Sequence, residues 1–246
     1  NVKDLPQETK DYVNFVLDRK VFAEGGQVVR QKYGVGDAVT KFIINRALTQ
    51  IKNTKDTYKK FNPILKDYNK TEKVLDFGSG LGHGTKELKG TIIKSHEPLT
   101  QHKKILNTKG KLPDYEDVNT LIQREGLNSQ DAITNHMVLN VIEDPLERQL
   151  TVKTIGDLLK KDGIGIITTR DKIDAVTKKS YLDGFLVQKD GQLTFQKSFS
   201  KDELQKYIKN ILGNTFEVSK IPPKYKVSGS GVIIKKVSSK KLELNL

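Results

Sequence analysis

The sequence predicts an α/β fold with a doubly wound, mostly parallel sheet and a helical N-terminal cap. From residue 73 onward, short apolar strands alternate with segments of helical length, which is the order that a parallel sheet requires. Before that point, apolar residues recur at the i, i+3, i+4 spacing of a helix face. We therefore expect a helical cap at residues 1–70 and a second, larger domain at 71–246.

Local patterns predict the individual elements of the second domain. The expected strands lie at residues 73–77, 91–96, 115–118, 130–135, 163–169, 216–218 and 231–234. Residues 184–196 have the pattern of a hairpin that turns at Asp190 and Gly191, a pair that favours the type I′ turn. A helix is expected at about 201–212, with Ser200 as its N-cap.

The most informative segment is 74–85, VLDFGSGLGHGT, in which an apolar strand runs directly into alternating glycines. Glycine allows a tight strand-to-helix turn and lets the main chain approach a ligand closely, and the N–H groups of the following helix are available beyond it. The segment therefore predicts a cofactor site. A dinucleotide fingerprint starting at Gly78 would need a third glycine where His83 stands, which disfavours an NAD-binding oxidoreductase.

The order Asp-x-Gly-x-Gly-x-Gly from Asp76 to Gly82 resembles the first motif of class I S-adenosylmethionine (SAM) dependent methyltransferases. Glu97 agrees with that family, because it ends an expected strand roughly 20 residues past the glycine loop, where a Rossmann-like fold places the carboxylate that binds a ribose diol. Residues 131–145 are similar to the family's fourth strand and following turn. Asn140 stands there where the family pattern often has His.

Residues 158–168 are similar to the family's helix end, tight turn and fifth strand, although Asp162 and Ile164 depart from the usual Pro and second Gly. The resemblance covers about residues 73–170. It implies a Rossmann-like sheet of seven strands that ends with an antiparallel strand. In that fold, the hairpin near 184–197 is an insertion after the fifth strand.

The resemblance also implies that SAM is the cofactor, and it assigns the cofactor-binding residues. These are Asp76, Gly78, Ser79, Gly80, Gly82, Glu97, Pro98, Asp117, Val118 and Asn135. The glycines would pass beside the amino-acid end of SAM, where Asp76 orients the loop or receives the ammonium through water. Asp117 and Val118 would end the third strand, from which the family often contacts adenine.

Methyl transfer from a sulfonium mainly requires an aligned nucleophile and the exclusion of water, so a strong base is optional. If a base is used, His136 is the best-placed candidate, because it follows the fourth strand and imidazole titrates near neutrality. Asn140 would position the acceptor by hydrogen bonding. Packing in the wall of the site is the alternative for both residues.

Composition limits the chemistry further. The chain has no Cys, which excludes a cysteine adduct and thiolate metal sites. Its four His, at positions 83, 96, 102 and 136, have no paired carboxylate spacing, so no metal site is expected. The chain also has no apolar run of about 20 residues that could cross a bilayer and no apolar core of a signal peptide. A cytoplasmic protein is therefore expected.

The acceptor is the open question. A net charge of +13 favours binding to phosphates, but nearly all of the positive charge is Lys, and Arg, which reads phosphate and guanine better, stands only at positions 19, 30, 46, 124, 148 and 170. Thr-Asn-His-Met at 134–137 replaces the Asn/Asp-Pro-Pro-Tyr/Phe motif of enzymes that methylate DNA bases on exocyclic amines. We therefore favour a small or medium-sized acceptor. RNA, or a catalytically idle SAM-binding interaction module, remains an alternative.

Overall fold

The computed structural model describes residues 54–82, 84–98, 112–173, 178–189 and 192–237. The helices expected before residue 54 lie outside this part of the chain, so the cap and the boundary near residue 70 stay predictions. No helix within the described ranges is long and apolar enough to cross a membrane.

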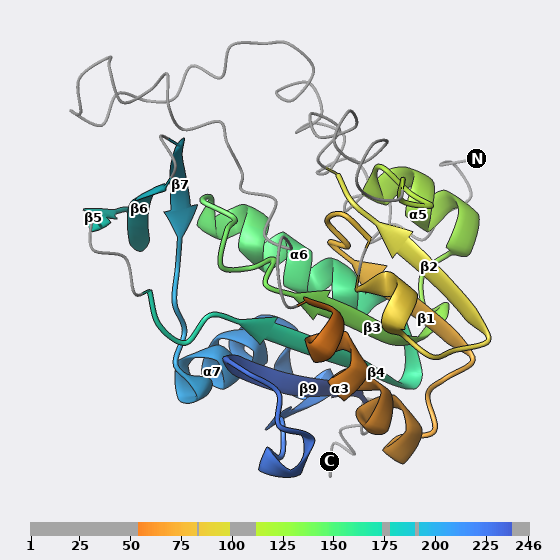
Figure 1. Ribbon diagram of the computed structural model, residues 1–246. Coiled ribbons are helices and arrows are strands. Elements are labelled where there is room, and N and C mark those ends of the chain that lie inside the picture. The colour runs from red at the N-terminus through yellow and green to blue at the C-terminus, as the bar shows by residue number, and fades with distance from the viewer. Residues whose placement is uncertain (1–53, 83, 99–111, 174–177, 190–191, 238–246) are drawn as a thin grey trace, which may run out of the picture. The chain divides into compact units, whose positions relative to one another are not determined.

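Helices and strands alternate along most of the described chain (Figure 1). In chain order they are α3 (Thr54–Asp67), β1 (Lys73–Phe77), η2 (Thr85–Glu87), β2 (Ile92–His96), α5 (Val118–Glu125), β3 (Gln130–His136), α6 (Pro145–Leu158), β4 (Leu159–Thr169), β5 (Lys178–Tyr181), β6 (Gly184–Lys189), β7 (Gln192–Gln196), α7 (Lys201–Leu212), η4 (Gly213–Thr215), β8 (Phe216–Lys220), η5 (Pro223–Tyr225) and β9 (Ser230–Lys236).

The main sheet confirms the predicted fold class. Its strand order is β2-β1-β3-β4-β9-β8, in which β2, β1, β3 and β4 are parallel and the last two strands are antiparallel to their neighbours. The chain adds β2 on one side of β1 and then β3 on the other. The winding of the sheet therefore reverses between the neighbouring strands β1 and β3. Open α/β sheets bind ligands at the carboxyl ends of the strands at such a switch point.

The strand expected at 115–118 was wrong. Tyr115 forms only an isolated bridge to His96, and α5 begins three residues later. The reason is local: the Asp117 carboxylate accepts hydrogen bonds from the backbone N–H and the hydroxyl of Thr120, which makes it a helix N-cap. The main sheet therefore has six strands in the described residues, where seven were expected.

The expected hairpin near residues 184–197 is confirmed in its two arms. Strands β6 and β7 pair in antiparallel fashion, although the expected turn at residues 190 and 191 lies outside the described residues. Strand β5 was not predicted; it pairs with β6 and makes a separate three-stranded sheet with β6 and β7. The helix expected after this sheet is α7, and Ser200 caps it in a capping box with Glu203.

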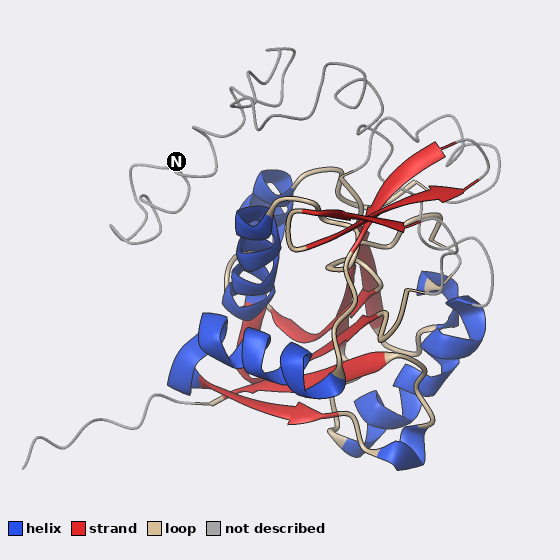
Figure 2. Cartoon of the chain, turned by 90° about the vertical axis from the view of Figure 1, so that its left-hand side faces the viewer, coloured by secondary structure: helices blue, strands red, loops and turns tan. Residues whose placement is uncertain are grey.

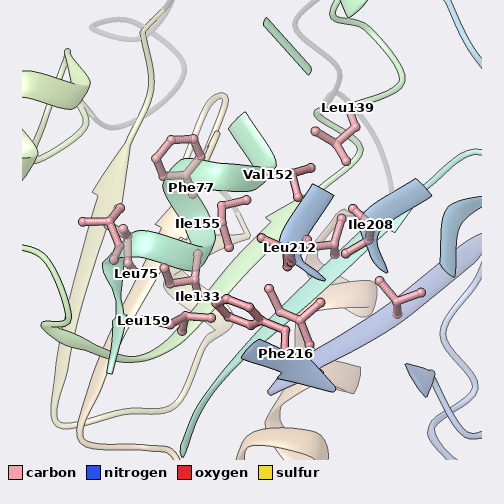
Figure 3. Packing of buried hydrophobic residues seen from close by; sticks show 14 of the residues in the cluster. Leu75, Phe77, Ile133, Leu139, Val152, Ile155, Leu159, Ile208, Leu212 and Phe216 are labelled. Carbon is pink, nitrogen blue, oxygen red and sulfur yellow. The ribbon is translucent and has the colours of Figure 1, made fainter. Parts of the chain in front are cut away.

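Helices cover both faces of the main sheet (Figure 2). On one face, α6 and α7 bury apolar side chains such as Ile155 and Ile208 against Leu75 and Ile133 (Figure 3). On the other face, α3 buries Tyr58, Phe61, Ile64 and Leu65. Because side chains alternate along a strand, β1, β3 and β4 each contribute to both clusters. Apolar packing thus holds the sheet on both faces, and this packing positions the carboxyl ends of its strands.

Candidate cofactor site at the carboxyl edge of the sheet

The loops that follow β1, β2 and β3 meet at the carboxyl edge of the sheet. Three glycines of the first loop have left-handed backbone angles, with φ of +86° at Gly78, +54° at Gly80 and +69° at Gly82. A Cβ on Gly78 would lie 2.3 Å from the Cγ2 atom of Val138 in the loop after β3. Glycine is therefore required here both by the turn and by the close approach of the two loops.

Main-chain hydrogen bonds tie the glycine loop to the end of β2. The N–H groups of Gly78 and Ser79 both donate to the carbonyl oxygen of His96, at 2.8 and 3.0 Å. One residue further, the Gly80 N–H donates to the Glu97 carboxylate at 2.7 Å. Glu97 is only 6% exposed, so the structure places a buried carboxylate beside the loop, and its role in binding ribose stays a prediction.

Asp76 lies fully buried below the loop and accepts hydrogen bonds from three hydroxyls. Tyr58 and Thr134 donate to its Oδ1 atom, each at 2.9 Å, and Thr85 donates to Oδ2. Burial raises the pKa of Asp76 to about 6, while the three hydrogen bonds act in the opposite direction. The carboxylate thus joins α3, β3 and the end of the glycine loop.

His136 is buried between the end of β3 and helix α3. Its Nδ1 atom lies 2.6 Å from the Thr168 hydroxyl, and its ring meets the rings of Tyr58 and Phe61 edge-on, at centroid distances of 5.5 and 5.9 Å. Burial lowers the pKa of His136 to about 4, so the imidazole is neutral at pH 7. Its neighbour Asn135 faces the opposite side of the sheet and donates to the Phe77 carbonyl at 2.8 Å.

The remaining predicted residues fall into two groups. Pro98 follows Glu97 at the edge and is exposed, while Asp117 caps α5 and Val118 packs against the core. Asn140, in contrast, is buried under the three-stranded sheet and donates to Gln196 at the end of β7. The structure therefore gathers Asp76, the glycines and Glu97 at one edge and puts Asn140 next to the insertion.

Sequence reasoning missed the three hydroxyl donors to Asp76. Thr134 could have been found, because it alternates with the apolar Ile133 and so shares the face of Asp76 once β1 and β3 pair. Tyr58 has only the signature of a core residue, since Phe61 and Leu65 follow it at helical spacing. Its partner is defined by tertiary packing alone.

Comparisons with known proteins show the fold. No family model and no curated protein matches the chain. Among solved structures, an amino pentose methyltransferase from Micromonospora echinaspora, with SAM bound, is 13% identical, with a TM-score of 0.54 over 75% of this chain and 92% of that one. A sugar N-methyltransferase from Streptoalloteichus sp. is 12% identical, with a TM-score of 0.53 over 85% and 96%. A protein from Pyrococcus horikoshii OT3 gives 14% identity and a TM-score of 0.55 over 83% and 100%.

These similarities, together with the sheet order, define the fold. The chain has the Rossmann-like fold of class I SAM-dependent methyltransferases.

Proposed function

We propose that this chain is a SAM-dependent methyltransferase that holds its cofactor at the carboxyl edge between β1 and β3. One observation carries the proposal: the buried Glu97 carboxylate lies against the Gly80 amide, beside three glycines in the left-handed conformation. When bound, SAM supplies a methyl group made electrophilic by its sulfonium. The chain must then bind SAM, align the acceptor with the methyl group and exclude water.

The residues at this edge suit SAM better than a dinucleotide. A carboxylate is an acceptor of hydrogen bonds only, which matches the two hydroxyl donors of a ribose diol. A dinucleotide fingerprint would need a third glycine at position 83, where this loop has His. In this assignment Glu97 binds the ribose, the glycines lie beside the amino-acid end, and Asp117 and Val118 lie on the adenine side.

Transfer forms a bond between the acceptor nucleophile and the methyl carbon and breaks the bond between that carbon and sulfur. The acceptor loses a proton if the nucleophile is an O–H or N–H group. We assign His136 as the candidate base, through its Nε2 atom, because Nδ1 is engaged by Thr168. A group with a pKa near 4 is a weak base, so alignment and exclusion of water carry most of the rate.

We further propose that the acceptor is a small or medium-sized molecule. Two of the similar structures are named as methyltransferases of an amino pentose and of a sugar, which supports this class of acceptor. RNA is the competing acceptor, and salt distinguishes the two. A polymer held by six or more phosphate contacts would lose about a thousandfold in affinity between roughly 50 and 200 mM salt. We expect weak RNA binding at physiological salt, and tight, RNA-selective binding would contradict the small-molecule proposal.

Calorimetric titration tests the cofactor proposal. The full chain should bind SAM and its product S-adenosylhomocysteine at one site. Gly80→Val should abolish binding, because a β-branched side chain opposes a φ of +54° and fills the space beside the loop. Failure of the parent chain to bind either compound would refute the proposal, as would unchanged affinity in a folded Gly80→Val variant.

A further inference from the structure

Helix α3 reaches the cofactor edge through one side chain, Tyr58. The residue is fully buried, and its hydroxyl donates to Asp76 at 2.9 Å. Its ring lies against the end of the glycine loop so closely that a Cβ on Gly84 would be 2.2 Å from the Tyr58 Cε2 atom. The same ring meets His136 edge-on. Tyr58 therefore contacts both the loop after β1 and the end of β3.

Asp76 depends on such partners because no cationic side chain in the described part of the chain pairs with its charge. Instead, the hydroxyls of Tyr58, Thr85 and Thr134 donate hydrogen bonds to its carboxylate. A buried carboxylate without a cation stays ionised only if hydrogen bonds replace its hydration. Two of the three donors share the Oδ1 atom, and Tyr58 is the one that comes from outside the sheet and its loop.

We propose that Tyr58 is a positioning residue for cofactor binding, which acts by fixing the ionised Asp76 carboxylate under the glycine loop. This inference rests on the proposed function, since the group that Asp76 faces is the ammonium at the amino-acid end of SAM. In this arrangement, the packing of α3 on the sheet is coupled to the charge below the loop, because the Tyr58 hydroxyl that joins the helix to β1 also stabilises the Asp76 carboxylate.

The pH dependence follows from the groups that face Asp76. From α3 comes Tyr58, from β3 the neutral His136 lies on the same face, and Glu97 at the end of β2 opposes ionisation by its like charge. The pKa of Asp76 is raised to about 6 in the free protein. An ammonium bound nearby favours the ionised form, so affinity should fall as the pH decreases through about 6.

Removing the Tyr58 hydroxyl removes one of the hydrogen bonds that lower the pKa of Asp76, so the pKa rises and the loss of affinity begins at a higher pH. The experiment measures the dissociation constant of S-adenosylhomocysteine by calorimetry between about pH 5 and 7.5, where its amino group stays largely protonated. For Tyr58→Phe we expect the profile to move upward by roughly half to one pH unit, which weakens affinity about two- to fivefold near pH 6 and about three- to tenfold well below it. At pH 7.5 the two proteins should approach each other.

Tyr225→Phe is the matched control. Its hydroxyl also donates to a carboxylate of α3, Asp67 at 2.7 Å, and its ring belongs to the same apolar cluster. That carboxylate is exposed and lies at the other end of the helix, so the pH profile should remain that of the parent.

The outcomes separate the possible failures. A Tyr58→Phe profile that equals the parent's, or that is lowered equally at every pH, overturns the positioning role, because simple loss of packing carries no pH signature. If Tyr58→Phe does not fold, Thr134→Val removes the other donor to Oδ1 and must show the same upward displacement, and its absence overturns the inference. Failure of the parent to bind S-adenosylhomocysteine refutes the proposed function instead.

Discussion

At the cofactor edge, main-chain hydrogen bonds join the glycine loop to the end of β2, whereas the attachment of the sheet of β5, β6 and β7 depends strongly on charged side chains. The glycine loop bonds to the backbone of His96, and its shape follows from glycine angles. The three-stranded sheet instead depends on the fully buried Arg148 of α6. The guanidinium donates to the carbonyl oxygen of Ile142 and pairs with Asp183, in the turn between β5 and β6.

Further side-chain contacts support this attachment, in addition to the hydrogen bond from Asn140 to Gln196. Lys197 pairs with the same Asp183 at 3.2 Å, and the Tyr181 hydroxyl donates to Glu143 at 3.0 Å. Phe195 of β7 lies under the Arg148 guanidinium, 5.6 Å from ring centroid to Cζ. The cofactor edge is therefore defined by contacts that follow from strand order. The three-stranded sheet is defined by a few charged side chains far apart in the sequence.

The largest effect is expected for substitution of Arg148, whose side chain connects α6 to the three-stranded sheet. Arg148→Met should lower the free energy of unfolding by about 3 kcal/mol, because it leaves the buried Ile142 carbonyl without its donor and removes the buried guanidinium that pairs with the exposed Asp183. Urea unfolding measures the change. Lys220→Met, which breaks the exposed pair of Lys220 with Asp202, should cost no more than about 0.5 kcal/mol. Equal costs for the two variants would contradict the comparison.

The next effect concerns the backbone of the cofactor edge. Gly78→Ala should weaken S-adenosylhomocysteine binding more than about a hundredfold, because the new Cβ meets Val138 and the loop must move. Gly126→Ala is the control, since Gly126 has a similar φ of +80° and nothing within 4 Å of the new Cβ. Gly126→Ala should add backbone strain without a steric clash, so its cofactor affinity should equal that of the parent. Retained binding in Gly78→Ala would show that the loop tolerates a side chain.

A single carboxylate should matter somewhat less than the loop that holds it. Glu97→Gln should weaken cofactor binding about ten- to a hundredfold, because a charged acceptor of the ribose hydroxyls is lost. Calorimetry measures the change, and Glu217→Gln on the exposed side of β8 is the control. Affinity within about twofold of the parent would exclude Glu97 from the ribose site.

The sequence predicted those features that depend on local signals, and it did not predict those that depend on tertiary packing. The strand at 73–77 and the helix at 201–212 were predicted with their observed bounds, because apolar runs, glycines and the Ser200 cap are local signals. The hydrogen bond of Tyr58 to Asp76 and the pair of Arg148 with Asp183 could not be predicted. These partners are 18 and 35 residues apart, and only packing brings them together.

The smallest effect concerns a lysine of β9 that behaves as part of the core. The Lys236 ammonium donates to the carbonyl oxygens of Gly156 and Leu159, each at 2.9 Å, at the junction of α6 and β4. Lys236→Met should therefore cost about 1 kcal/mol of stability. Its neighbour Lys235 makes only a 3.9 Å pair with Asp162, so Lys235→Met should leave stability nearly unchanged. Thermal unfolding of both variants measures the difference.

The most direct test of the cofactor edge is a crystal structure of the full chain with S-adenosylhomocysteine. We expect both ribose hydroxyls within hydrogen-bond distance of the Glu97 carboxylate, roughly 2.5 to 3.0 Å, and the amino-acid end of the ligand beside the loop from Gly78 to Gly82. A ligand bound elsewhere, or one whose ribose does not contact Glu97, would contradict the account.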